Sequence, residues 1–483
     1  MTYWLRLCLV GLALFAVQSV SSSSSVTNKV VCYFGSWAVY RLGNGKFEPE
    51  NVQPNLCTHL IYSFVGLGYD GKVTVLDTWN DLPDGKDGFG RFLALRKQNP
   101  AVKVMAAIGG WNEGSQKYSQ VMNDDSKRAV FVQSVVDFVT EYGFDGFDLD
   151  WEYPAQRGGA ASDKGAYVKL LQELRPKFDE RGLLLSAAVG AGRYLVQESY
   201  DLPSLSKYLD FINMMTYDLH GSWESETGQN APLYASSVDT TPEAQALNVN
   251  ASIHYWIENG ATPSKIVLGM GTYGRSFSLP SAGLVGPGAP ASGPGSAGPY
   301  TRESGMLGYN EICELEKEGG WTVVWDDEQK VPYASKGNQW VGYDNIESIK
   351  LKTQFAVDLG LGGAMIWSVE TDDFLGTCAG YKYPLLTAIN EVLSGGSITP
   401  PPTTSTSSTS SPPTTSSTTP GGAIDPTGPC KETGYVRDPT NCAVFYYCQL
   451  AGGIYTASRF ECPAGLAYDP KMNGCNYKDQ VDC

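Results

Sequence analysis

Residues 144–154, FDGFDLDWEYP, combine the side chains of this sequence best suited to proton transfer. Side chains alternate between two faces in an extended strand, so Asp148, Asp150 and Glu152 project to one side. The residues between them are large and apolar, which favours a buried strand over an exposed one with solvated acids. In a barrel strand, these acids would line the lumen, with Glu152 at the carboxyl mouth where barrel active sites occur.

Such a row of acids should retain protons. Burial and neighbouring negative charges both raise carboxyl pKa values, so we expect at least one shared proton. A protonated Glu152 could then donate its proton to a glycosidic oxygen near neutral pH. A Mg²⁺ site is the alternative, because alternating carboxylates also bind divalent cations. With only three histidines in the chain, and no comparable second acidic cluster, we expect neither metal nor cofactor.

Eight short apolar or β-branched runs could supply the strands around this row. Helix-length segments such as 127–142 and 166–181 separate several of them, which indicates parallel βαβ units. Eight units in about 370 residues predict a (β/α)₈ TIM barrel, with an open doubly wound sheet as the alternative α/β fold. The Gly/Pro-rich and then aromatic-rich stretch at about 274–354 predicts an inserted α+β subdomain. The predicted strands are 30–34, 59–64, 102–108, 147–150, 183–188, 211–215, 266–270 and 363–367.

The composition changes sharply along the chain. Residues 1–25 contain Arg6, a short apolar run and a small polar stretch, typical of a cleavable signal peptide, with a buried helix as the alternative. A Ser/Thr/Pro-rich stretch at 395–425 predicts an extended, O-glycosylated linker. We therefore expect a secreted, extracellular protein with a catalytic unit at 26–394 and a small unit at 426–483.

Charge and cysteine content narrow the partners and the compartment. The net charge of −16 and the pI of 4.7 disfavour binding to nucleic acid or to anionic membranes, while a neutral polymer remains allowed. Removal of the signal peptide would leave ten of the eleven cysteines, an even number that favours disulfides. Six of them lie between Cys430 and Cys483 and predict a small disulfide-held module. A monomer is the default expectation.

The acid-rich segment resembles the catalytic signature of glycoside hydrolase family 18 chitinases, of animal or arthropod type. This resemblance implies an endo-acting chitinase that cleaves β-1,4-linked N-acetylglucosamine in chitin and chito-oligosaccharides. It also implies a retaining mechanism in which the substrate's own acetamide is the nucleophile. Similar segments are VVCYFGSWAVYR (30–41), CTHLIYSF (57–64), AAIGGWN (106–112), LLLSAAV (183–189), MMTYDLHGSW (214–223), GTYGRSF (271–277) and GAMIWSVETDDF (363–374).

The resemblance also implies roles for individual residues. Glu152 would protonate the leaving oxygen and later activate water, and Asp150 would hold the acetamide N–H. Asp148 would share a proton with Asp150, Asp145 would support the strand end, and Tyr217 would bind the acetamide carbonyl. Aromatic rings suit the apolar faces of sugars, although core packing is their commoner role, and Trp367 would form the floor of the cleavage subsite. The implied substrate-binding residues are Trp37, Trp111, Tyr153, Met215, Asp218, Trp223, Tyr273, Arg275 and Trp367.

The C-terminal unit resembles a peritrophin-A type chitin-binding module of carbohydrate-binding family 14. Counting alone leaves fifteen pairings of its six cysteines open. The resemblance implies the pairs Cys430–Cys448, Cys442–Cys483 and Cys462–Cys475, and chitin contacts at Tyr446, Tyr447, Phe460 and Tyr477. In the catalytic unit, it implies Cys32–Cys57 and Cys313–Cys378. Asn250 begins an N-x-S sequon and is a candidate glycosylation site.

Two other functions compete with a chitinase. A non-hydrolytic chitin lectin could share the scaffold, but such relatives typically lack the glutamate that Glu152 supplies here. An acidic metal-dependent hydrolase would need the Mg²⁺ site considered above. The glycines Gly269, Gly271 and Gly274 match a dinucleotide-binding pattern, but a Pro/Gly-rich stretch follows them where such a fold needs a helix.

Overall fold

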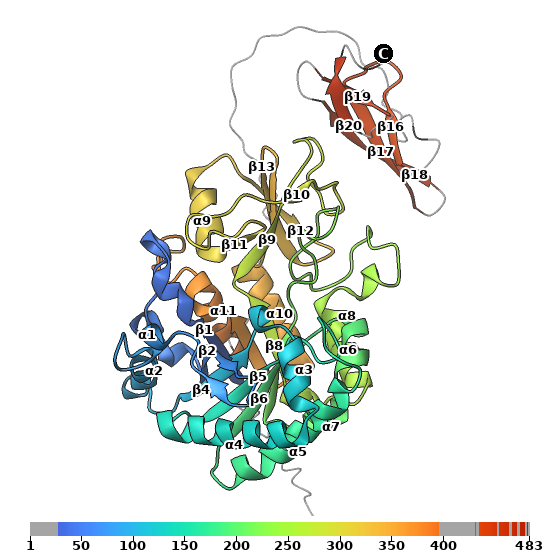
Figure 1. Ribbon diagram of the computed structural model, residues 1–483. Coiled ribbons are helices and arrows are strands. Elements are labelled where there is room, and N and C mark those ends of the chain that lie inside the picture. Colours follow the sequence, from blue (N-terminus) through green and yellow to red (C-terminus); the bar gives the residue numbers. More distant parts are fainter. Residues whose placement is uncertain are drawn as a thin grey trace, which may run out of the picture.

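The computed structural model describes residues 28–395, 430, 434–451, 454–462, 466–470, 474–478 and 481 (Figure 1). The predicted signal peptide at 1–25, and all of the predicted linker at 395–425 except residue 395, lie outside the described residues. In the part of the chain that is described, no helix has both the length and the apolar character that a membrane crossing requires.

Eight parallel strands form a closed barrel at the centre of the large unit (Figure 1). Each of the eight predicted runs forms one strand, and β1 pairs with both β15 and β2, which closes the ring. The predicted (β/α)₈ barrel is therefore confirmed and the open sheet is wrong. The barrel strands are β1 (Lys29–Gly35), β2 (His59–Leu67), β4 (Lys103–Gly109), β5 (Gly146–Asp150), β6 (Leu184–Gly190), β7 (Phe211–Met215), β8 (Ile266–Gly271) and β15 (Gly363–Trp367). A short strand, β3 (Val73–Thr74), extends β2 as an antiparallel pair.

Helices surround this barrel and bury apolar side chains against it. Helix α4 (Asp125–Tyr142) shows how its sequence sets its limits: Asp124 caps the first backbone N–H groups, and Gly143 ends it with a φ of 80°. The other helices of this unit outside the insertion are α1 (Thr78–Asp81), α2 (Gly88–Leu93), α3 (Gln116–Met122), α5 (Asp163–Asp179), α6 (Arg193–Ser199), α7 (Leu202–Tyr208), α8 (Val249–Glu258), α10 (Ile346–Asp358) and α11 (Pro384–Leu393).

An antiparallel sheet and one helix, α9 (Tyr309–Glu318), interrupt the barrel between β8 and α10. The strands are β9 (Tyr273–Ser278), β10 (Gly293–Pro294), β11 (Met306–Gly308), β12 (Thr322–Asp326), β13 (Val331–Lys336) and β14 (Gln339–Gly342). The insertion is thus α+β, but the boundary expected at about 354 falls inside α10. That helix packs mainly against α11 and β15, with smaller contacts to β8 and to β13 of the insertion, so it belongs largely to the barrel.

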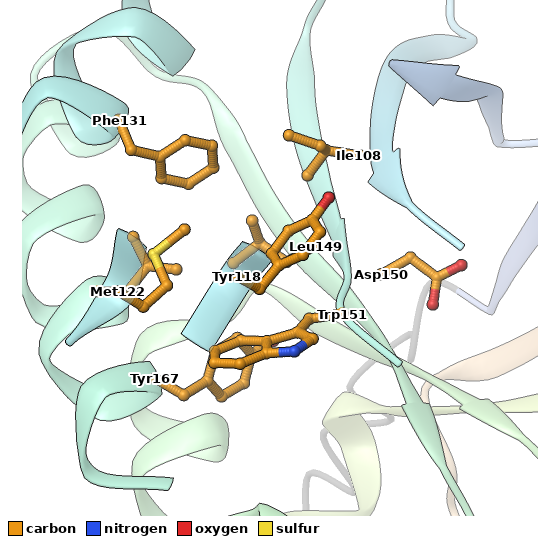
Figure 2. A pocket seen from close by; sticks show the side chains of 9 residues that line it. Ile108, Tyr118, Met122, Phe131, Leu149, Asp150, Trp151 and Tyr167 are labelled. Atoms are coloured by element: carbon orange, nitrogen blue, oxygen red, sulfur yellow. The ribbon is translucent and has the colours of Figure 1, made fainter. Parts of the chain in front are cut away.

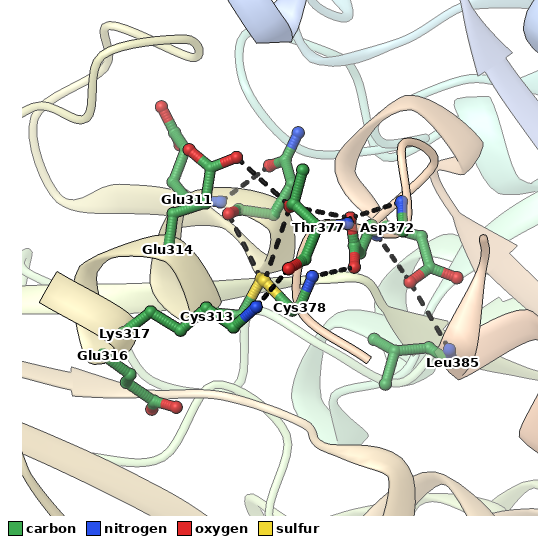
Figure 3. Close-up of a disulfide and its surroundings, with 12 residues drawn as sticks. Glu311, Cys313, Glu314, Glu316, Lys317, Asp372, Thr377, Cys378 and Leu385 are labelled. Atoms are coloured by element: carbon green, nitrogen blue, oxygen red, sulfur yellow. Dashed lines mark hydrogen bonds between the residues drawn. A yellow bond between two sulfur atoms is a disulfide. The ribbon is translucent and has the colours of Figure 1, made fainter. Parts of the chain in front are cut away.

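Two disulfides bond the large unit internally. Cys32 on β1 is joined to Cys57, just before β2. Cys313 on α9 is joined to Cys378 in the loop that follows β15, so this bond ties the insertion to the barrel (Figure 3). Beside it, the Thr377 hydroxyl donates to a Glu314 carboxylate oxygen at 3.2 Å. Both pairs are those that the resemblance implied.

The small unit is a disulfide-containing β module. It has a three-stranded and a two-stranded antiparallel sheet, and Phe445 stacks on Tyr468 at a centroid distance of 4.5 Å. Cys430 forms a disulfide with Cys448. Cys442 and Cys462 are each in a disulfide as well. The side chains of Cys475 and Cys483, their expected partners, lie outside the described residues. The strands are β16 (Gly434–Arg437), β17 (Val444–Ala451), β18 (Ile454–Glu461), β19 (Leu466–Asp469) and β20 (Gly474–Tyr477).

Candidate active site

The three alternating acids occupy the carboxyl half of β5 and the residues that follow it. Asp148, Asp150 and Glu152 are only 0, 3 and 8% exposed. Figure 2 shows that the carboxylate of Asp150 points away from the apolar side chains packed between β5 and the surrounding helices. Those side chains include Leu149, Trp151, Met122, Phe131 and Tyr167. The strand therefore separates acids from apolar residues as its alternation predicts.

Asp148, the deepest acid, receives hydrogen bonds from uncharged donors. The Tyr33 hydroxyl donates to Oδ2 at 2.7 Å, and the Ser186 hydroxyl and Asn213 amide donate to Oδ1 at 2.5 and 3.3 Å. Burial raises the pKa of Asp148 to about 6, and these hydrogen bonds oppose the rise. Sequence reasoning gave Tyr33 no chemical role and missed the other two donors. Their signal was a polar residue in an otherwise apolar barrel strand.

Asp150 and Glu152 continue the row toward the mouth of the barrel. Asp150 Oδ1 is buried and has no hydrogen-bond partner among the described residues. Burial, together with the charges of Glu152 and Asp148, raises the pKa of this carboxyl well above its ordinary value. Burial raises the pKa of Glu152 to about 7, the charge of Asp218 adds to the rise, and Tyr153 and Arg157 oppose it. A carboxyl with this pKa can release and regain a proton near neutral pH.

Asp145 lies apart from these three acids, immediately before β5 begins. Its Oδ2 accepts hydrogen bonds from Arg96 Nη2 at 2.7 Å and from the Val104 backbone N–H at 2.8 Å. These contacts join the amino ends of β4 and β5, at the opposite end of β5 from Glu152. We therefore place Asp145 with the residues that hold the strands rather than with those that could touch a substrate.

A second polar group follows β7 and faces the inserted sheet. Asp218 accepts hydrogen bonds from the Tyr273 hydroxyl at 2.6 Å and from Arg275 Nε and Nη2 at 2.7 Å each. Beside it, the buried Tyr217 ring meets Tyr273 edge-on, and its hydroxyl contacts Met365 Sδ at 3.9 Å. Because Tyr273 and Arg275 come from β9, the insertion contributes directly to this site.

Aromatic rings lie at or near the carboxyl ends of β1, β2 and β15. Phe64, Trp37 and Trp367 form a triangle of rings, with the Phe64 centroid 6.1 Å from that of Trp37 and 5.6 Å from that of Trp367. Trp37 and Trp367 themselves lie 6.1 Å apart, and Trp37 is 42% exposed. Sequence reasoning selected both tryptophans but missed Phe64, which reads there as an ordinary apolar strand residue.

The other expected binding residues occupy different surroundings. Trp111 is 60% exposed beneath the Arg157 guanidinium, which lies 3.6 Å from the ring centroid. Trp223 is 61% exposed, with Arg275 at 5.4 Å from its ring. Tyr153 and Met215 are half-buried and pack against the apolar core. The two tryptophans are thus available to a ligand, while Met215 contributes packing and Tyr153 also forms a hydrogen bond with Glu152.

Some expectations concern residues away from the barrel mouth. Asn250 lies in the first turn of α8, and Ser252 of the same sequon is buried. In the small module, the half-buried Tyr446 donates its hydroxyl proton to Asp438 at 2.9 Å. The side chains of Tyr447, Phe460 and Tyr477 lie outside the described residues.

A divalent metal site, the alternative interpretation of the acid row, has little support in the arrangement of potential ligands. Among the described residues, one group of three potential ligands is close enough to hold an ion: Cys313, Asp373 and Cys378. Its two cysteines are already joined to each other. The acid row on β5 does not form such a group.

Two family models match this sequence. The model described as glycosyl hydrolases family 18 covers residues 29–372, and that of the chitin binding peritrophin-A domain covers residues 430–483. The chain belongs to glycosyl hydrolases family 18. Both resemblances seen in the sequence are therefore confirmed, and the enzyme class is that of a family 18 glycoside hydrolase of the chitinase type.

Individual relatives cover most of the large unit. An endochitinase of Manduca sexta is 42% identical, over 82% of this chain and 73% of its own. The crystal structure of an Ostrinia furnacalis Group IV chitinase in complex with allosamidin matches with 44% identity and a TM-score of 0.75, covering 77% of this chain and all of that one. Human YKL-39, described as a pseudo-chitinase with retained chitooligosaccharide binding, matches with 41% identity and a TM-score of 0.71, over 76% of this chain and all of that one.

Proposed function

We propose that the protein is a secreted, endo-acting chitinase that hydrolyses the β-1,4 linkages of chitin and chito-oligosaccharides, with Glu152 as its general acid and base. The observation that carries this proposal is the buried acid row, which ends in a carboxyl whose pKa is raised to about 7. The insect relatives, which are described as chitinases, support the choice of substrate.

The mechanism proposed uses the substrate's own acetamide as nucleophile. Its carbonyl oxygen attacks the anomeric carbon while the protonated Glu152 gives its proton to the departing glycosidic oxygen. Asp150 accepts a hydrogen bond from the acetamide N–H and stabilises the positive oxazolinium that forms, and Tyr217 orients the acetamide carbonyl. The Glu152 carboxylate then removes a proton from a water molecule while the water oxygen attacks the anomeric carbon. The bond from that carbon to the acetamide oxygen breaks, so the acetamide is restored and the product has retained configuration.

The aromatic residues give this site its proposed binding surface. Trp367, with Phe64 and Trp37 stacked beside it, would support the apolar faces of the sugar rings. Trp111 and Trp223 are more than half exposed and would contact rings further along the chain of sugars. The small module would bind chitin separately, which raises the local concentration of the barrel on insoluble substrate.

The rival function, a chitin lectin, is represented among the relatives by human YKL-39. Overall similarity cannot separate the two functions, because its identity of 41% lies close to the 44% of the Ostrinia furnacalis chitinase. The presence of Glu152, at the point where the row meets the mouth of the barrel, favours hydrolysis. A metal-dependent hydrolase would lose activity with a chelator, and we expect no such loss.

The deciding experiment compares Glu152→Gln with wild type on a fluorogenic chito-oligosaccharide. The amide retains the shape but cannot donate an acidic proton, so we expect kcat to fall by about 10³-fold or more while binding of the oligosaccharide is retained. Glu173→Gln is the matched control, since Glu173 pairs with Arg128 on the outer helices. A wild-type chain that leaves soluble oligosaccharides uncut would refute the proposal, and so would an active Glu152→Gln variant.

A further inference from the structure

A buried glutamate lies directly behind the tryptophan pair of the proposed binding surface. Glu370 is in the short 3₁₀ turn Val369–Thr371, three residues after Trp367, and its side chain is fully buried. None of the steps proposed above uses this carboxylate. Burial raises its pKa, and Arg41 opposes the rise. A buried acid is costly to maintain, so its contacts indicate what it does.

Glu370 contacts both ends of the segment that carries Trp37, one through its carboxylate and the other through its carboxylate and its backbone carbonyl. That segment is the 3₁₀ turn Ser36–Tyr40, which begins after Gly35 and ends before Arg41. The backbone N–H of Gly35 donates to Glu370 Oε2 at 3.1 Å. Arg41 approaches Oε1 with Nη2 at 4.0 Å and donates from Nη1 to the Glu370 backbone carbonyl at 3.4 Å.

The same side chain also holds the segment that carries Trp367. The Ser368 hydroxyl, adjacent to Trp367, donates to Glu370 Oε1 at 2.5 Å. From the other side, Thr272 donates its backbone N–H to the Trp367 carbonyl at 3.0 Å and its hydroxyl to the Ser368 carbonyl at 2.6 Å. The Trp367 segment is thereby fixed from two directions.

Gly35 shows how closely these parts fit. A Cβ at this position would lie 2.5 Å from Glu370 Oε1 and 2.8 Å from Cζ2 of the Trp37 ring. The carboxylate and the indole therefore occupy the space beside the same α-carbon. Any displacement of the Glu370 side chain would free space directly next to the Trp37 ring.

We propose that Glu370 is a positioning residue for sugar binding: by fastening both ends of the Trp37 segment to the Trp367 segment, it fixes the two indoles as one platform. This inference rests on the proposed function. Its physical basis is preorganisation, because rings already held in the bound orientation lose less freedom when a sugar chain stacks on them.

The first test measures the affinity for a chito-oligosaccharide in the hydrolytically inert Glu152→Gln background, by quenching of tryptophan fluorescence. Glu370→Ala removes every contact of the carboxylate, and we expect the Kd to rise by about tenfold. Glu370→Gln can still accept from Gly35 and bond to Ser368, so its Kd should stay within about twofold of the parent. In the active enzyme, Glu370→Ala should raise KM more than it lowers kcat.

The matched control is Asp210→Asn. Asp210 likewise accepts a backbone N–H, from Leu185 at 2.7 Å, and an arginine, Arg175 at 2.8 Å, but does so at the amino end of the barrel. This substitution should lower stability without changing the Kd. An unchanged Kd in Glu370→Ala, an equal rise in Glu370→Gln, or an equal rise in the control would each overturn the positioning role.

A second variant keeps the test decisive if Glu370→Ala does not fold. Gly35→Ala leaves Glu370 in place but forces the carboxylate or the Trp37 ring to move, and the φ of −78° at this position accepts alanine. We expect its Kd to rise about fivefold or more, and an unchanged Kd would overturn the inference. A wild-type enzyme without hydrolytic activity would refute the proposed function alone, because these affinities remain measurable.

Discussion

The acids that precede β5 and β7 at the amino end of the barrel have different surroundings from the row of acids that begins on β5. At the amino end, Asp145 and Asp210 each accept one backbone N–H and one arginine, with donor distances of 2.7–2.8 Å. At the carboxyl end, the acids from Asp148 to Glu152 form no ion pair with any described residue. Within the described parts of the chain, Asp148 is hydrogen-bonded only to uncharged donors, and Asp150 Oδ1 has no hydrogen-bond partner.

This difference separates acids that stabilise from acids that are available for reaction. A carboxylate with a cation and a backbone donor is satisfied and adds to stability. A buried carboxyl without a cation lowers stability unless it retains a proton, and such groups gather where chemistry needs a shifted pKa. The comparison therefore predicts that substitutions of Asp145 and Asp210 reduce stability, and that substitutions in the acid row on β5 reduce activity.

After Glu152→Gln, the largest effect should come from Asp150→Asn. Removal of the charge proposed to stabilise the oxazolinium should lower kcat by about 10²–10³-fold, a loss typical of one electrostatic contact to a transition state. The melting temperature should stay the same or rise, because a buried and incompletely bonded acid is replaced by a neutral amide. The value of kcat is measured on a chito-oligosaccharide, and the melting temperature is measured by thermal denaturation. A stable variant with unchanged kcat would contradict the comparison.

The free energy of unfolding should depend on pH through Glu152, because the pKa of this residue differs between the folded and the unfolded chain. The pKa of Glu152 is about 7 in the folded protein and near 4.5 ordinarily, so the unfolded chain releases this proton at lower pH. The resulting stabilisation is complete below about pH 4.5 and is lost as the pH rises through 7, by roughly 3 kcal/mol. Denaturant unfolding of wild type and Glu152→Gln between pH 4 and 8 measures this difference. Parallel curves for the two proteins would show that Glu152 ionises normally.

Local patterning accounts for what the sequence predicted well. Alternation along β5 predicted that all three acids share one face, because a strand has only two faces. The apolar residues between them predicted that the strand is buried. Each of the eight barrel strands is a short apolar or β-branched run that differs in composition from the segments around it. Because eight such runs could be counted, the closed barrel could also be predicted. The end of the insertion could not, since the pattern of α10 does not reveal which neighbours the helix packs against.

Contacts between distant strands account for what sequence reasoning missed. Ser186 and Asn213 reach Asp148 from β6 and β7, 38 and 65 residues away along the chain. Phe64 owes its place to the two tryptophans stacked on it. The partners of Asp145 were missed for the same reason: the resemblance gave it a supporting role at the strand end, but Arg96 and Val104 lie 49 and 41 residues away along the chain.

Asp145→Asn tests the stabilising end of the barrel with an intermediate effect. The amide weakens a charge-assisted hydrogen bond to Arg96 and leaves the Val104 N–H with a poorer acceptor. We expect the free energy of unfolding to fall by about 1–3 kcal/mol, with kcat within about twofold of wild type. Urea denaturation and steady-state kinetics measure the two quantities. A large fall in kcat at full stability would move Asp145 into the catalytic group.

Ser186→Ala should have the smallest effect, because it removes one neutral donor from an acid that touches no substrate. The lost hydrogen bond lowered the pKa of Asp148, so that pKa should rise and Asp148 should carry less negative charge near neutral pH. Less charge on Asp148 lowers the pKa of Asp150, which that charge had raised. The acid limb of the pH profile of kcat should therefore move to lower pH by a fraction of a unit, with kcat reduced only about twofold to fivefold.

Ser199→Ala is the matched control, since Ser199 is equally buried and its hydroxyl has no hydrogen-bond partner among the described residues. A shift in Ser186→Ala alone would show that the row titrates as one unit, whereas identical profiles would mean that Asp148 acts independently of the acids above it.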